Sequence, residues 1–129
     1  MSTSEAQIRN LIEHWAEAAR NGDMEGVLAH HAKDIVMYDV PFPFQSIGID
    51  AYRETWNTFF AWSQGLGVFD ITQLNVVAGE DVAFCFATMT CSGKTDGQRE
   101  DLSFRLTVGL VKENGTWAIV HEHHSLPSA

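Results

Sequence analysis

The sequence predicts an α+β fold, in which a curved, mainly antiparallel sheet wraps around about three N-terminal helices. Two observations support this prediction. Apolar residues recur at helical spacing through the first half of the chain, whereas strand-like segments separated by turn signals fill the second half. The chain contains no repeat or linker, and its 129 residues are enough to bury one core. We therefore expect a single domain that covers residues 1–129.

The three expected helices are marked by their end signals. Ser4 opens a capping box and starts the first helix, which ends at Asn21-Gly22. Asp23 caps a short second helix that extends to about His31. The third helix begins near Asp50 and ends at the glycines of QGLG. An apolar stripe predicts that this helix packs on a core: Tyr52, Trp56, Phe59 and Phe60.

Five strand-like segments are expected, one before the third helix and four after it. The first is DIVMYDV, residues 34–40, which ends at the prolines of PFPF because proline has no N–H to donate to a ladder. The other four span residues 68–77, 81–92, 99–112 and 116–125. AGED, KTDG and KENG separate them as turn signals, which predicts antiparallel neighbours.

The segment 99–112 alternates between an apolar and a polar row. The apolar row consists of Leu102, Phe104, Leu106, Val108 and Leu110, and the polar row includes Arg105 and Thr107. We expect the row with Arg105 to look toward the helices, so another surface must cover the apolar row. A second copy of the chain is the simplest cover, and we expect a homodimer through the outer face of the sheet.

The composition argues against several kinds of partner. The 17 acidic and 8 basic residues give a formal net charge of −9, which disfavours nucleic acid and anionic membrane surfaces. Cys85 and Cys91 share a strand face roughly 20 Å apart, too far for a disulfide, so we expect buried thiols in a reducing compartment. The N-terminal segment lacks the features of a signal peptide, and no segment approaches the roughly 18 apolar residues of a membrane span. These features predict a cytoplasmic protein.

The last strand ends in three closely spaced histidines. One face carries the two large anchors and the positions in phase with them: Trp117, Ile119, His121, His123 and Ser125. A curved sheet opens away from its helices at the strand end, so we expect His121 and His123 to enter a cavity with Trp15 and Trp56. His124 is expected on the other face. Ser125 completes the predicted ligand-binding side of this strand.

Asp39 is the candidate general base. It is in phase with the apolar residues of its strand, and Phe42 and Phe44 are expected to surround it as walls of the ligand site. A carboxylate withdrawn from water is a good proton acceptor. The alternatives are that Asp39 caps the turn before Pro41 or pairs with Arg105, since a desolvated arginine needs an anionic partner in the protein or on a ligand.

Three other features have a plainer interpretation. His121-x-His123 resembles half of a metal site, with Asp39 needed as a third ligand. No cysteine or glutamate spacing supports such a site, so we expect neither a metal nor a cofactor. His30 and His31 are interpreted as solvated or packing residues.

Three stretches together resemble one protein family over nearly the whole chain. They are LIEHWAEAARNGDMEGVLAHHAKDIVMYD, GIDAYRETWNTFF and FRLTVGLVKENGTWAIVHEHHSLP. The sequence resembles the SnoaL-like branch of the nuclear-transport-factor-2-like superfamily. The resemblance implies a cone-shaped α+β fold, a deep apolar pocket and a dimer. Members include ketosteroid isomerases, epoxide hydrolases, dehydratases and polyketide cyclases, and also binding domains without chemistry.

The resemblance to ketosteroid isomerase extends to only part of that enzyme's catalytic site. Asp39 matches the position of the aspartate base, whereas Trp15 and Thr107 replace the two oxyanion-hole donors. Steroid isomerisation is therefore not expected. His121, His123 and Arg105 could supply proton transfer and anion stabilisation instead.

Two functions remain open at this stage. One is an acid–base isomerase, cyclase or dehydratase acting on a small apolar carbonyl compound. The other is a non-catalytic binding domain in which Arg105 holds the carboxylate of a hydrophobic acid.

Overall fold

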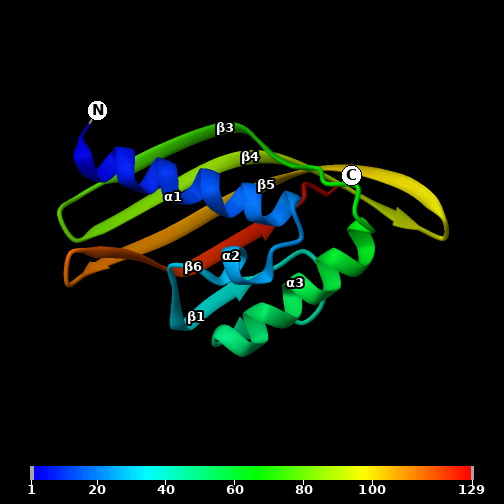
Figure 1. Ribbon diagram of the computed structural model, residues 1–129, viewed down its shortest axis with the longest axis horizontal. Coiled ribbons are helices and arrows are strands. Elements are labelled where there is room, and N and C mark those ends of the chain that lie inside the picture. Colours follow the sequence, from blue (N-terminus) through cyan, green and yellow to red (C-terminus); the bar gives the residue numbers. More distant parts are fainter. Residues whose placement is uncertain (1, 129) are drawn as a thin grey trace.

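In the computed structural model, which describes residues 2–128, six strands form one curved sheet and three helices lie along one face of it (Figure 1). The helices are α1 (Thr3–Arg20), α2 (Met24–Leu28) and α3 (Ile49–Ser63). The strands are β1 (His31–Tyr38), β2 (Ser46–Ile47), β3 (Phe69–Ala78), β4 (Val82–Thr95), β5 (Gln98–Glu113) and β6 (Thr116–Ser125). This arrangement confirms the predicted α+β class.

The sheet brings the first long strand beside the last. The strand order is β2-β1-β6-β5-β4-β3, and β1 runs parallel to β6 whereas the other neighbours are antiparallel. α1 packs over β3, while α3 contacts both β1 and β4 and so spans the concave face of the sheet. β1 and β6, which lie far apart in the sequence, are therefore side by side in the sheet (Figure 1).

Three predicted element ends are wrong. Ser2, not Ser4, caps α1, because its hydroxyl accepts a hydrogen bond from the Glu5 N–H at 3.0 Å. Asp23 caps α2 as expected and accepts from Gly26, but this helix ends at Leu28. The chain then enters β1 at His31, earlier than predicted, because it pairs with the start of β6 there.

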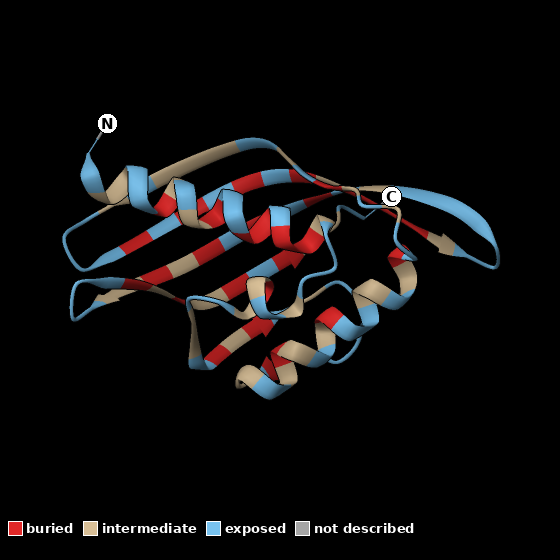
Figure 2. Cartoon of the chain, in the orientation of Figure 1, coloured by how far each residue is buried: buried red, intermediate tan, exposed pale blue. Residues whose placement is uncertain are grey.

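The apolar row of β5 lies on the core face of the sheet. Phe104, Leu106 and Val108 are buried within the single chain, and Leu102 packs against the same core (Figure 2). The prediction that this row faces outward, and would form the dimer surface, is wrong. The strand simply shows the alternation of an antiparallel sheet that has one face on the core and one face in solvent.

A β-bulge in β6 explains why the faces were misassigned. Ile119 pairs with Leu110 and His121 pairs with Gly109, so Val120 is an extra residue without a partner on β5. Residues before the bulge and residues after it therefore alternate in opposite phases. Trp117 and Ile119 point into the core as predicted, but beyond Val120 the inward positions become the even-numbered ones.

Both cysteines are free and buried, as the sequence predicts. Among residues 2–128, no helix combines the length and the apolar character needed to cross a membrane.

Truncating the two faces of β5 is expected to have very different effects. Leu106→Ala should lower the free energy of unfolding by about 2–5 kcal/mol because it leaves a cavity in the core. Thr107→Ala, on the exposed face of the same strand, should change it by less than about 0.5 kcal/mol. Urea denaturation of both variants measures this, and equal losses would contradict the assignment of the faces.

Candidate active site

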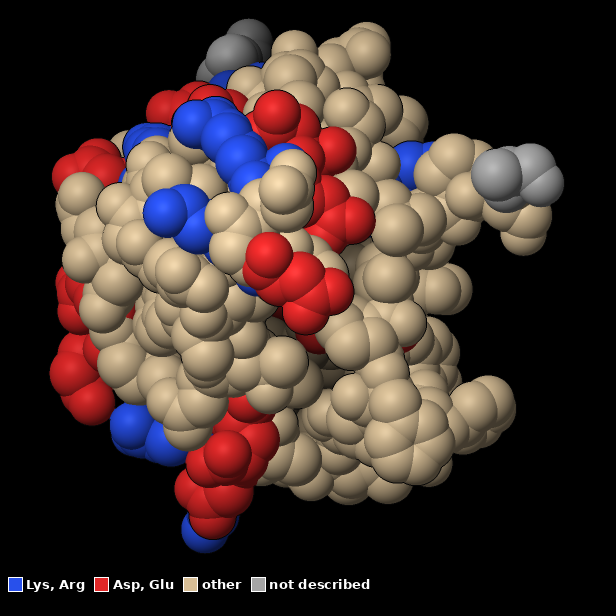
Figure 3. Space-filling model, turned by 90° about the vertical axis from the view of Figure 1, so that its right-hand side faces the viewer, with Lys and Arg blue, Asp and Glu red and all other residues tan. Residues whose placement is uncertain are grey.

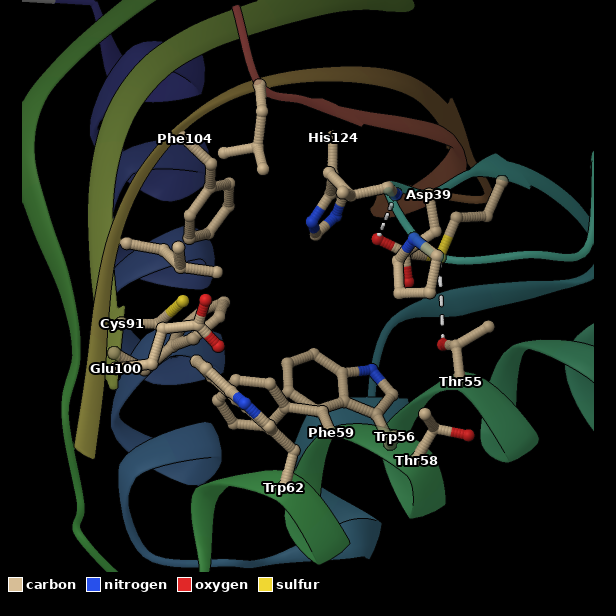
Figure 4. A pocket seen from close by; sticks show the side chains of 16 residues that line it. Asp39, Thr55, Trp56, Thr58, Phe59, Trp62, Cys91, Glu100, Phe104 and His124 are labelled. Atoms are coloured by element: carbon tan, nitrogen blue, oxygen red, sulfur yellow. Dashed lines mark hydrogen bonds between the residues drawn. The ribbon is translucent and has the colours of Figure 1, made fainter. Parts of the chain in front are cut away.

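A cavity of about 300 Å³ opens between α3 and the sheet. Five aromatic side chains form much of its wall: Trp56, Phe59, Trp62, Phe69 and Phe104. The polar side chains that line it are Asp39, Thr55, Thr58, Cys91, Glu100 and His124 (Figure 4). Figure 3 shows a hollow on this side of the molecule, with acidic side chains above and below it. The cavity is thus a largely apolar chamber with a few ionisable groups.

Behind one wall of this cavity lies a buried carboxylate, Glu122, which is 0% exposed. Its Oε2 accepts a hydrogen bond from the Tyr52 hydroxyl at 2.7 Å and lies 2.5 Å from His31 Nε2. Its Oε1 lies 2.9 Å from His124 Nε2. Trp15 Nε1 in turn donates to the Tyr52 hydroxyl at 3.1 Å. We call these five side chains the Glu122 network.

The Glu122 network holds a negative charge inside the protein. Burial alone would raise the Glu122 pKa, but hydrogen bonds from His124 and His31 and their charges outweigh it and lower the pKa to about 2. Burial, and then the charge of Glu122, raise the pKa of Tyr52 well above its ordinary value. Glu122 is therefore ionised at neutral pH, and Tyr52 remains a hydrogen-bond donor.

His124 connects this network to the cavity. Its ring stacks on Phe104, with centroids 5.5 Å apart and an interplanar angle of 6°, and packs edge-on against Trp15. Burial would lower the His124 pKa, but the hydrogen bond and charge of Glu122, together with the charge of Asp39, raise it. Because Nε2 is committed to Glu122, Nδ1 is the nitrogen left for a molecule in the cavity. His124 is thus suited to act as a proton donor.

Asp39 lies at the cavity beyond the end of β1, where the sequence predicted an inward carboxylate. It is half-buried, and its Oδ1 accepts a hydrogen bond from the Val40 N–H at 2.8 Å. In Figure 4, Asp39 and His124 approach the same space from neighbouring strands. The cavity therefore brings a carboxylate and an imidazole to one ligand.

Several residues predicted for this site lie on the opposite face of the sheet. His121 and His123 come after the bulge and face outward, where both rings pack edge-on against Tyr38. Arg105 is exposed, and its Nε donates to the Ser125 hydroxyl at 3.1 Å. Arg105 and Ser125 therefore bind no ligand in the cavity, and Arg105 does not pair with Asp39.

The predicted ligand walls are also partly wrong. Phe42 and Phe44 are 92% and 89% exposed and do not surround Asp39. Trp56 lines the cavity as predicted, but Trp15 lies beneath it in the core. Thr107 is on the outer face, so neither Trp15 nor Thr107 occupies an oxyanion-hole position at this cavity.

Three residues of the site were missed or misjudged from the sequence. From the sequence, His124 is expected on the outer face, His31 is interpreted as a solvated or packing residue, and Glu122 has no predicted role. A glycine inside a strand often marks a bulge, and Gly109 immediately precedes the register shift. Allowing for a bulge there would have turned Glu122 and His124 inward together.

The sequence matches the SnoaL-like domain family over residues 8–129. The chain belongs to this family. One similar solved structure is an NTF2-like protein of unknown function from Pseudomonas putida KT2440, with 34% identity, a TM-score of 0.83 and coverage of 100% of this chain and 91% of that chain. No curated protein matches the sequence at a significant level.

Two more distant structures share the fold. A ketosteroid isomerase-like protein from Erwinia carotovora atroseptica SCRI1043 has 19% identity and a TM-score of 0.80, with 100% of each chain covered. An NTF2-like protein with a cystatin-like fold from Novosphingobium aromaticivorans has 16% identity and a TM-score of 0.74, with 94% of this chain and 80% of that chain covered. These similarities confirm the fold of the SnoaL-like domain. At this level of identity they show the fold alone, so the chemistry has to follow from the residues of the site.

Replacing Glu122 by Gln is expected to remove a pH-dependent part of the stability. The folded-state pKa of Glu122, about 2, lies below its ordinary value of 4.5, so its contribution is present above pH 4.5 and is lost as the pH falls toward 2. Glu122→Gln should flatten this dependence and lower the free energy of unfolding at pH 7 by about 3–5 kcal/mol, because it leaves His31 and His124 without their carboxylate. Urea denaturation across this pH range measures both effects.

The contribution of His124 to stability depends on pH in the opposite direction. Its raised pKa means that its contribution is present below pH 6.5 and is lost as the pH rises through the folded-state pKa. His123→Gln, on the outer face, is the matched control and should keep the wild-type profile. A wild-type profile that coincides with that of Glu122→Gln would contradict the assignment.

Proposed function

We propose that this SnoaL-like domain is an acid–base enzyme that acts on a small, largely apolar carbonyl compound, as an isomerase, cyclase or dehydratase. The observation that carries the proposal is the meeting of Asp39 and His124 at one aromatic-walled cavity. Catalysis of this kind needs two groups that flank one substrate. The cavity volume, about 300 Å³, is at the lower end for ligand sites and suits a molecule of one or two rings.

In the proposed reaction the Asp39 carboxylate takes a proton from the carbon next to the substrate carbonyl. The electron pair of that C–H bond forms a carbon–carbon double bond, and negative charge develops on the carbonyl oxygen. The His124 imidazolium donates a hydrogen bond or a proton from Nδ1 to this oxygen. In an isomerase Asp39 then returns the proton to a different carbon, while the carbonyl re-forms and any proton on its oxygen goes back to His124. In a dehydratase the C–O bond of a β-hydroxyl group breaks instead, and the hydroxide leaves as water with the proton that Asp39 took. In a cyclase the carbon forms a bond to a second carbonyl carbon, whose oxygen takes that proton.

The Glu122 network supplies the protonated histidine that this scheme needs. An imidazole in the apolar wall would otherwise lose its proton, because burial disfavours the charged form. The ionised carboxylate behind His124 reverses that preference and fixes the ring orientation. His124 thereby takes the roles that the sequence assigned to His123 and Arg105.

A non-catalytic domain for a hydrophobic acid receives less support from the site. Its predicted clamp, Arg105, is on the outer face, and the carboxylates of Asp39 and Glu100 line the cavity. A bound carboxylate would meet like charges there. If the proposal fails, the experiment below should show a protein that binds ketones in the cavity but does not catalyse proton exchange.

Proton exchange at carbon tests the proposal without knowledge of the natural substrate. A panel of cyclic and aryl ketones is incubated with the protein in D₂O, and loss of the α-proton signals is followed by NMR. Asp39→Asn and His124→Gln should each slow the catalysed exchange by about 10²–10⁴-fold. His123→Gln changes the histidine next to His124, which is exposed on the outer face, and should exchange at the wild-type rate. Ketones that bind in the cavity but exchange no faster than in buffer would contradict the proposal.

We also propose a homodimer through the outer face of the sheet, with a different surface from the row first predicted. Phe84 and Phe86 are 46% and 45% exposed on β4, and Val77 is exposed beside them on β3. Such neighbouring apolar side chains favour a partner surface.

The two free cysteines support the cytoplasmic location expected from the sequence.

Introducing charge on this outer surface tests the dimer. Phe84→Glu combined with Phe86→Glu should give a monomer in sedimentation-velocity measurements, because it places two buried charges in the interface. Thr107→Glu, directly opposite Phe86 on β5, adds one charge to the same surface and should weaken the dimer less than the double substitution. A wild-type protein that sediments as a monomer at all concentrations would contradict the dimer.

A further inference from the structure

The charged side chains that line the cavity, apart from His124, are all carboxylates. Asp39 and Glu100 line it, and in the part of the chain that the structure describes no lysine or arginine side chain does. The only other ionisable groups in the wall are Cys91 and His124. Figure 4 shows the Glu100 carboxylate and Trp62 across the cavity from Asp39. A bound molecule therefore meets a carboxylate at each end.

Glu100 and Trp62 are fixed relative to each other by a short chain of hydrogen bonds. Trp62 Nε1 donates to the Thr95 hydroxyl at 3.2 Å, and this hydroxyl donates to Glu100 Oε1 at 2.9 Å. The Trp62 ring also occupies the space beside Gly93 where any side chain would stand, since a Cβ there would lie 2.1 Å from the ring. The aromatic ring and the carboxylate are thus preorganised at the cavity mouth.

The carboxylates of Asp39 and Glu100 affect the pKa values of groups in the cavity wall. Burial, and then the charges of Asp39 and Glu100, raise the pKa of the Cys91 thiol to about 11. The charge of Asp39 also contributes to the raised pKa of His124. Burial is the main cause of the pKa shift at Cys91 and Glu122 is the main cause at His124, and the carboxylates at the cavity add to both shifts in the same direction.

From this geometry we propose that the ligand carries a positively charged nitrogen, such as a tertiary or quaternary ammonium group, which binds between Glu100 and the faces of Trp62 and Phe59. This inference rests on the proposed function, since it takes the same cavity as the substrate site. The carbonyl end of the ligand then lies at Asp39 and His124. An ammonium group gains both from the carboxylate and from aromatic faces, whose π-systems attract cations.

Three para-substituted acetophenones provide the test. One carries a trimethylammonium group, one a tert-butyl group and one a carboxylate. The first two are isosteric, so their difference in affinity reports charge alone. By isothermal titration calorimetry the wild-type protein should bind the ammonium compound about tenfold more tightly than the tert-butyl compound, and the carboxylate most weakly. Added salt should reduce the preference, because Glu100 is exposed at the mouth.

Variants at the mouth should change the preference in a defined order. Glu100→Gln should lose most of it, and Glu113→Gln, which removes an exposed carboxylate at the far end of β5, should retain it. Trp62→Phe should keep part of the preference and Trp62→Leu should lose more, since leucine has no aromatic face. A tert-butyl compound that binds as tightly as the ammonium compound, or a preference unchanged in Glu100→Gln, would overturn the proposal.

This experiment measures binding alone and so separates the two proposals. The ammonium preference can be present when Asp39→Asn exchanges ketone protons at the wild-type rate, which would remove the proposed chemistry only. Conversely, exchange that depends on Asp39 and His124 but shows equal affinity for the isosteric pair would remove the ammonium ligand only.

Discussion

The structure depends on one buried carboxylate. Glu122 is inaccessible to solvent, and an ion of this kind is stable in a protein only when hydrogen bonds replace its hydration. Its partners come from three elements: His31 at the start of β1, Tyr52 on α3 and His124 on β6 itself. The hydrogen bonds to Glu122 therefore connect the parallel β1–β6 pair to α3, the helix that covers it. The same contacts orient the imidazole at the cavity.

The fold and the site are coupled through the bulge at Val120. Without the extra residue, Glu122 would lie on the solvated face and His121 would point into the core. The bulge thus decides which of the closely spaced histidines meets the ligand. It also explains how a strand that begins with the core anchors Trp117 and Ile119 can end with Glu122 buried and His124 lining the cavity. A local irregularity of one residue separates a structural half of β6 from a functional half.

Sequence periodicity was sufficient for the class, for the order of the three helices and the five long strands, and for the capping role of Asp23, because these depend on local patterns and turn chemistry. The two-residue strand β2 was not predicted, because it is too short to show an alternation. It also placed Asp39 correctly, since β1 keeps its alternation from Ile35 to Met37. It failed for His123, His124 and Arg105, because a bulge reverses the alternation without changing composition. It failed for His31 because the partner, Glu122, is 91 positions away in the chain. Contacts of that range follow from the parallel β1–β6 pairing, which no local pattern reveals.

The central claim is that Glu122 keeps His124 protonated at the cavity wall. The most direct measurement is ¹⁵N NMR of the His124 side chain as a function of pH, in the wild type and in Glu122→Gln. The account predicts that the wild-type ring titrates above the ordinary value of 6.5, with both nitrogens protonated at pH 6.5, and that its pKa falls when Glu122 is replaced. A wild-type ring that is neutral at pH 6.5, or a titration that is the same in Glu122→Gln, would contradict it.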